Sequence, residues 1–141
     1  MNKRAWIWLV ASSMLLLPAA SRADDLTDAT QLLCATTRAS ECYADGSCVE
    51  GEPEDWNVPR FMRFDLAQKT LSTTKASGEE RSTPMQSLVH EGDRVFIQAA
   101  QTGRAVSMVI NQSTGLASAG IVLDGHVLTV FAHCTPLDSS D

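Results

Sequence analysis

Apolar and polar residues alternate along most of the chain after residue 60, as expected for strands that bury one face. Val106, Met108 and Ile110, for example, would share one face of a strand. Turn sequences interrupt the alternation about every ten residues, and the clearest is the two-residue hairpin signal Asp124-Gly125. The pattern predicts strands at residues 60–66, 70–74, 85–90, 94–100, 104–110, 116–123 and 126–133.

The short connections between these strands favour antiparallel pairing, because parallel strands need long crossovers. A seven-stranded meander with one apolar face must curl or close over its core. We therefore predict a mainly β fold, a small closed or partly open antiparallel barrel. Its interior should be lined by Met62, Phe64, Val106, Met108, Leu128 and Val130. The same apolar faces could enclose either a packed core or a cavity.

Residues 24–38 show a different spacing, with apolar side chains every three to four positions. Leu26, Ala29 and Leu32 would form one face of a short helix, and Asp24 or Asp25 could cap its first turn. We predict a helix here that packs against the barrel. Residues 39–59 are predicted to be largely loop.

The first 23 residues have the three parts of a secretory signal peptide. Lys3 and Arg4 precede an uncharged apolar run, residues 5–17, and small residues flank Arg22 before a cleavage point after Ala23. The alternative, a membrane anchor, would need about 20 apolar residues, and this run has 13. We expect residues 24–141 to be one periplasmic or secreted domain, without stable membrane insertion after cleavage.

The chain is acidic, with 17 Asp and Glu against 11 Lys and Arg. Loss of Lys3, Arg4 and Arg22 with the signal would change the net charge from −6 to −9. Such a surface repels phosphate backbones, so no nucleic-acid partner is expected.

All four cysteines follow the predicted signal, and an even number in a short exported chain indicates two disulfides. Three pairings are possible. We favour Cys42–Cys48, because the segment between them contains an Asp-Gly turn, and this leaves Cys34–Cys134. Zinc binding is the alternative, but no Cys-x-x-Cys pair is present.

Catalytic motifs are not evident. The chain has no Gly-x-Ser-x-Gly, and His90, His126 and His133 fall at ends of predicted strands outside any recognisable catalytic motif. We therefore expect neither enzyme activity nor a metal or other cofactor. A small hydrolase is a minor alternative.

An acidic segment precedes the first predicted strand, and its spacing does not match a calcium-binding EF-hand loop. It offers possible interaction residues, namely Glu50, Glu52, Glu54, Asp55 and Trp56.

Several short motifs lie between Cys34 and Cys134. They are the ring at residues 42–48, the run 56–65 leading into Lys69-Thr70-Leu71, and the turn 111–115 before a hairpin. In these motifs the chain resembles a loose group of small exported bacterial β-proteins with no assigned activity. Its layout is distantly similar to lipocalin-like barrels and to small periplasmic inhibitor barrels. The resemblance implies an exported barrel and no particular activity.

Two functions remain open from the sequence. The first is a non-enzymatic binding module that takes a small apolar ligand in the barrel mouth, or a protein at the loops of one end. The second is a protein inhibitor or envelope accessory whose acidic segment, residues 50–55, meets a basic partner.

Overall fold

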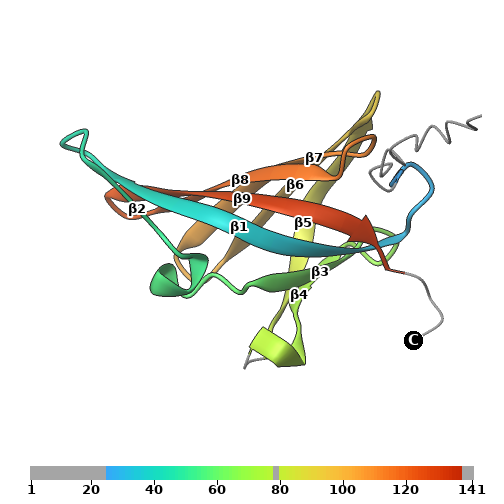
Figure 1. Cartoon of the computed structure of the whole chain (residues 1–141), viewed down its shortest axis with the longest axis horizontal. Coiled ribbons are helices and arrows are strands. Elements are labelled where there is room, and N and C mark those ends of the chain that lie inside the picture. The colour runs from blue at the N-terminus through green and yellow to red at the C-terminus, as the bar shows by residue number, and fades with distance from the viewer. Residues whose placement is uncertain (1–24, 78–79, 138–141) are drawn as a thin grey trace, which may run out of the picture.

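The computed structural model describes residues 25–77 and 80–137, which form an antiparallel β-sheet (Figure 1). The strands are β1 Gln31–Tyr43, β2 Cys48–Gly51, β3 Phe61–Asp65, β4 Thr70–Thr73, β5 Ser82–Glu91, β6 Arg94–Gln101, β7 Arg104–Asn111, β8 Leu116–Leu123 and β9 His126–Pro136. Two short 3-10 helices lie between strands, η1 Pro53–Trp56 and η2 Lys75–Ser77. The predicted signal peptide, residues 1–23, lies outside the described residues.

The sheet closes into a barrel of eight strands, β1 and β3–β9, and β2 is an extra strand outside it. Closure comes from β1, which pairs with β9 along nearly its whole length, from Leu32 opposite Pro136 to Tyr43 opposite His126. The other edge of β1 pairs first with β3 and then with β2. The predicted antiparallel β fold is confirmed, and the barrel is closed.

The predicted helix over residues 24–38 is wrong. Residues 25–30 form turns, and the rest of the segment belongs to β1. The side chains of Leu32, Cys34 and Thr36 are buried at a spacing of two, as in a strand, while Leu33 is only half-buried. Pairing with β3 and β9 on both edges outweighs the weak helical preference of the segment.

The segment 39–59 is also more ordered than the predicted loop. It contains the end of β1, the strand β2 and the helix η1. The seven predicted strands correspond to β3–β9 with boundaries that differ by a few residues. The largest difference is at β5, which begins at Ser82 and includes Pro84, just before a register shift between Met85 and Ser87. Proline is tolerated next to such an irregularity.

One end of the barrel is plugged by the turn that precedes β1. The side chain of Leu26 is fully buried, and its backbone N–H donates to the carbonyl of Gln112 at 2.8 Å. The buried amide of Gln112 donates back to the Leu26 carbonyl at 3.1 Å. The core near this end contains Leu32, Phe64, Val95, Ile97, Ile110 and the disulfide Cys34–Cys134.

Gly115, in the β7–β8 turn, is required at this end of the barrel. Its φ of +71° lies in the region that favours glycine, and a Cβ atom here would collide with the backbone carbonyl oxygen of Cys134. The Cys134 N–H donates to the Gly115 carbonyl at 2.7 Å. The close approach of these two backbones joins the turn to β9.

Both predicted disulfides are confirmed. Cys34 and Cys134 face each other across β1 and β9 and are fully buried, whereas Cys42 and Cys48 close the β1–β2 hairpin. Because all four cysteines are oxidised, the zinc alternative is wrong. In the part of the chain that the structure describes, no group of three or more His, Cys, Asp or Glu side chains could hold a metal ion.

None of the helices in that part is long and apolar enough to cross a membrane.

Candidate functional site

A cavity of about 290 Å³ lies inside the end of the barrel opposite the Leu26 plug. It is bounded by the β6–β7 turn and by the segment between η1 and β3, whereas the plug contacts the β7–β8 turn. Five of the six residues predicted to line the interior do line this cavity, namely Met62, Phe64, Val106, Met108 and Val130. The sixth, Leu128, is buried in the core. Core residues near the plug, such as Leu32 and Ile110, do not line the cavity, so the interior is packed near the plug and hollow around Val106 and Val130.

Small side chains on two strands account for the empty space. Ala99 on β6 and Ala119 on β8 both point inward and line the cavity. Ala119 lies between Met108 and Val130 in the sheet register, and Ala99 lies opposite Val106. An alanine at an inward position fills much less volume than the larger neighbours, so the wall recedes at these two places.

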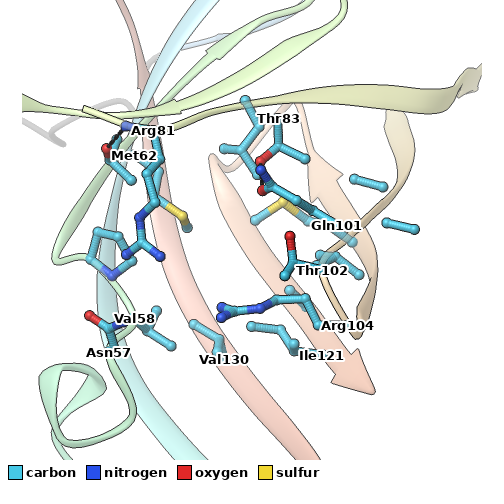
Figure 2. Close-up of a pocket in the computed structure, with 18 of the residues that line it drawn as sticks. Asn57, Val58, Met62, Arg81, Thr83, Gln101, Thr102, Arg104, Ile121 and Val130 are labelled. Carbon is cyan, nitrogen blue, oxygen red and sulfur yellow. Dashed lines mark hydrogen bonds between the residues drawn. The ribbon is translucent and has the colours of Figure 1, made fainter. Parts of the chain in front are cut away.

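The rim of the cavity is polar and carries positive charge (Figure 2). Of the described residues that line the cavity, Arg81 and Arg104 have charged side chains, and none of these described residues has a carboxylate. Figure 2 shows both guanidinium groups extending into the hollow, that of Arg104 from β7 and that of Arg81 from the residue before β5, with the Arg104 group directed toward Val58 and Val130. On the rim, the Thr83 hydroxyl donates a hydrogen bond to the side-chain oxygen of Gln101.

A second polar cluster, which we call the Glu41 cluster, consists of Glu41, Tyr43, Trp56 and His126. The Tyr43 hydroxyl and the Trp56 ring N–H donate to Glu41 Oε2 at 2.6 and 2.7 Å. His126 Nε2 lies 3.2 Å from Glu41 Oε1, and its Nδ1 lies 3.1 Å from the carbonyl oxygen of Asp124. The cluster therefore joins β1, η1 and the β8–β9 hairpin.

Charge and hydrogen bonding inside this cluster change two pKa values. The pKa of Glu41 lies below its usual range, chiefly because the Tyr43 hydroxyl donates to the carboxylate, and Trp56 and His126 act in the same direction against desolvation. The same hydrogen bond is the main reason why the pKa of Tyr43 is raised.

The Glu41 cluster should make stability depend on acid pH. A carboxyl whose pKa is lowered by folding stabilises the folded state above its ordinary pKa, and this contribution disappears as the pH falls through the lowered value. We expect Glu41→Gln to unfold at lower urea concentration than wild type at neutral pH, and the difference to shrink below about pH 4. Urea titrations monitored by Trp56 fluorescence at several pH values would measure this.

The matched control is Glu50→Gln, because Glu50 is exposed on the strand paired with β1. Its midpoint should stay close to that of wild type at neutral pH. A Glu41→Gln midpoint that differs from wild type by the same amount at neutral and acid pH would argue against an ionised Glu41 holding the cluster.

Most of the carboxylates in the acidic segment, which was predicted to bind a partner, form hydrogen bonds within the chain. The Arg60 guanidinium donates to Glu54 at 2.6 Å and to Glu52 at 3.2 Å, and the Arg60 hydrogen bond lowers the pKa of Glu54. The Asp55 carboxylate accepts from the backbone N–H of Glu52 at 3.1 Å.

Trp56, the fifth predicted interaction residue, also has contacts within the chain. It is half-buried, packs against the core and lies so close to Gly51 that a Cβ there would collide with the ring. Glu50 alone of the five predicted residues is exposed on a strand.

Arg81, Arg104 and Glu41 were not among the site residues predicted from the sequence. A signal for the arginines was present in the sequence, because alternate residues of a strand point to the same face. Arg104 is two and four positions before Val106 and Met108, which point inward, and Arg81 is four positions before the inward Met85. Glu41 gave no such signal, because its strand was not predicted. Models of known protein families give no match to this chain, and a search of curated proteins gives none either.

Proposed function

We propose that this protein is a non-enzymatic binding module that holds a small, largely apolar ligand in the open end of its barrel. The observation that carries the proposal is the cavity of about 290 Å³, which is just below the usual size of small-molecule sites, about 300–1,000 Å³. The wall of the cavity is mostly apolar, so an apolar molecule that enters it removes apolar surface from water. Met62 and Met108 in the wall are flexible enough to adapt to the shape of a ligand.

We further propose that the protein works in the periplasm or outside the cell after cleavage of residues 1–23. Two disulfides are compatible with an oxidising, exported location. The cavity is favoured over the acidic segment as the binding site, because Glu52, Glu54 and Asp55 already have partners within the chain.

A direct test uses phenylnaphthylamine, a neutral dye that fluoresces when it enters an apolar site. We expect its fluorescence to rise on titration into the protein. Ala119→Phe places a ring in the cavity and should weaken dye binding by at least about ten-fold, because the dye loses the apolar surface that would be removed from water.

The matched control is Ser118→Phe, at the neighbouring exposed position of β8. It adds the same ring outside the barrel and should leave dye binding unchanged. Circular dichroism would verify that both variants keep the fold. Equal dye affinity in wild type and Ala119→Phe, or no binding to the wild type, would overturn the proposal.

A further inference from the structure

We infer that the outward face of β6–β9 joins two copies of this chain, with the sheet of one copy against the sheet of the other. We call this surface the β6–β9 face. The inference concerns the outside of the barrel and is independent of what the cavity holds. It comes from the side chains on this face, the placement of charge in the chain and the area that the four strands offer.

Bulky apolar side chains point outward on these four adjacent strands. Phe96 on β6 lies opposite Val109 on β7. Ser118 on β8 lies between Val109 and Phe131 on β9. The Phe131 side chain is 48 % exposed, and Leu116, on the same side of β8 as Ser118, is 61 % exposed. Exposed apolar side chains that are contiguous across several strands mark an interaction surface.

Small side chains form a shallow row on the same face, next to a second bulky row. Ser107, Gly120 and Thr129 lie side by side on β7, β8 and β9, and a Cβ atom at Gly120 would meet no other atom within 4 Å. Two positions further along, Val122 and Val127 lie opposite each other and are both exposed. A raised row of a second copy can therefore fit between the two raised rows of the first, as side chains interdigitate when two sheets pack.

Charge is nearly absent from this part of the chain. Among residues 95–137 only Arg104 and Asp124 are Asp, Glu, Lys or Arg, whereas 20 % of the whole chain is charged. Arg104 lines the cavity, and Asp124 lies in the turn between β8 and β9. After Arg94, which begins β6, the outward positions of these four strands therefore carry no acidic residue, and their one exposed basic group is the imidazole of His133 near the end of β9.

The lack of charge favours a second copy over a different protein. In a contact with two-fold symmetry, residues near the axis meet their own counterparts, so any charge there faces a like charge. A different partner can match each charge with an opposite one. A chain of net charge −6 that associates with itself must therefore keep one face free of charge, as this chain does on the β6–β9 face. The same net charge would repel an anionic membrane.

The β6–β9 face is large enough for a weak dimer. Four strands about 4.8 Å apart, each of at least eight residues at about 3.4 Å per residue, give roughly 500 Å² per copy. Two copies would together bury about 1,000 Å², the lower limit for a specific interface. We therefore expect a dissociation constant in the micromolar range.

Sedimentation velocity of the protein, purified after export from cells that express the full chain, measures this association. Between about 1 and 200 µM, wild type should change from monomer to dimer. Phe131→Glu places a carboxylate in each half of the contact and should raise the dimer dissociation constant at least about ten-fold, because burying unpaired charges is costly. Val122→Glu, in the second bulky row, should act in the same direction.

The matched control is Phe61→Glu, the same substitution at an exposed phenylalanine of β3, which lies outside the β6–β9 face. It should leave the dissociation constant unchanged. Circular dichroism of each variant verifies that the fold is kept, and Val122→Glu takes the place of Phe131→Glu if the latter does not fold.

A wild type that stays monomeric throughout the concentration range would overturn the inference, as would equal weakening by Phe61→Glu and by both variants of the face. If the monomeric wild type instead floats with phosphatidylcholine vesicles and Phe131→Glu does not, the face binds a membrane surface and not a second copy. Dye binding reports separately on the cavity, so any of these failures leaves the proposed function standing.

Discussion

Replacing both Cys34 and Cys134 with alanine should lower the free energy of unfolding by about 4–5 kcal/mol. The disulfide joins residues separated by 100 positions, so it removes a large amount of conformational freedom from the unfolded chain. Small domains are stable by only about 5–15 kcal/mol, so this change removes a large part of the total. Alanine is the appropriate replacement because both positions are fully buried, where a serine hydroxyl would need a partner.

Urea denaturation under non-reducing conditions measures this effect, and the second disulfide provides the control. The Cys42–Cys48 bond spans only 6 positions, and its loss should cost about 2 kcal/mol in the same chain-entropy model. If the two double variants lost equal stability, the length of the closed loop would not be the cause.

Phe64→Ala should be the most damaging single truncation in the barrel wall, lowering the free energy of unfolding by about 3–5 kcal/mol. Phe64 is the bulkiest fully buried side chain in the part of the chain that the structure describes, and it lies between the packed core and the cavity. Removing its ring deletes buried apolar surface and joins the deleted volume to the existing hollow. The surrounding strands are paired on both sides, so they cannot collapse into the space.

The matched control is Phe61→Ala on the same strand, where the ring faces outward and is 37 % exposed. Its cost should be less than about 1 kcal/mol, as is usual for surface positions. Urea unfolding of both variants provides the comparison. A loss at position 64 no larger than that at position 61 would contradict the inward placement of Phe64.

The strands after residue 60 could be predicted because each depends mainly on its own sequence. Alternation and a short turn define a hairpin locally, as Asp124-Gly125 does for β8 and β9. β1 could not be predicted in this way. Its apolar positions, Leu32 and Leu33 among them, fit a helix as well as a strand, and only pairing with the distant β9 decides between the two.

From the sequence, a cavity was one of two alternatives, the other being a packed core. The choice depends on the side-chain volumes of residues that become neighbours only when the strands pair. Ala119 becomes a gap only once it is known to lie between Met108 and Val130. The positive rim was in principle visible, since Arg104 continues the inward series of β7. The convergence of Arg81 on the same hollow requires the closed barrel, which the sequence does not contain explicitly.

The closure of β1 against β9 also determines the order in which the molecule can assemble. β1 is the first strand of the barrel to be synthesised and β9 is the last. The hairpins from β3 to β9 can therefore form from local contacts before β1 pairs with β9. Non-local pairing of this kind folds slowly. Until it occurs, two strand edges stay open to other chains. Cys34 and Cys134 come directly opposite each other only in the closed barrel, so the disulfide between them covalently holds the closing pair of strands together.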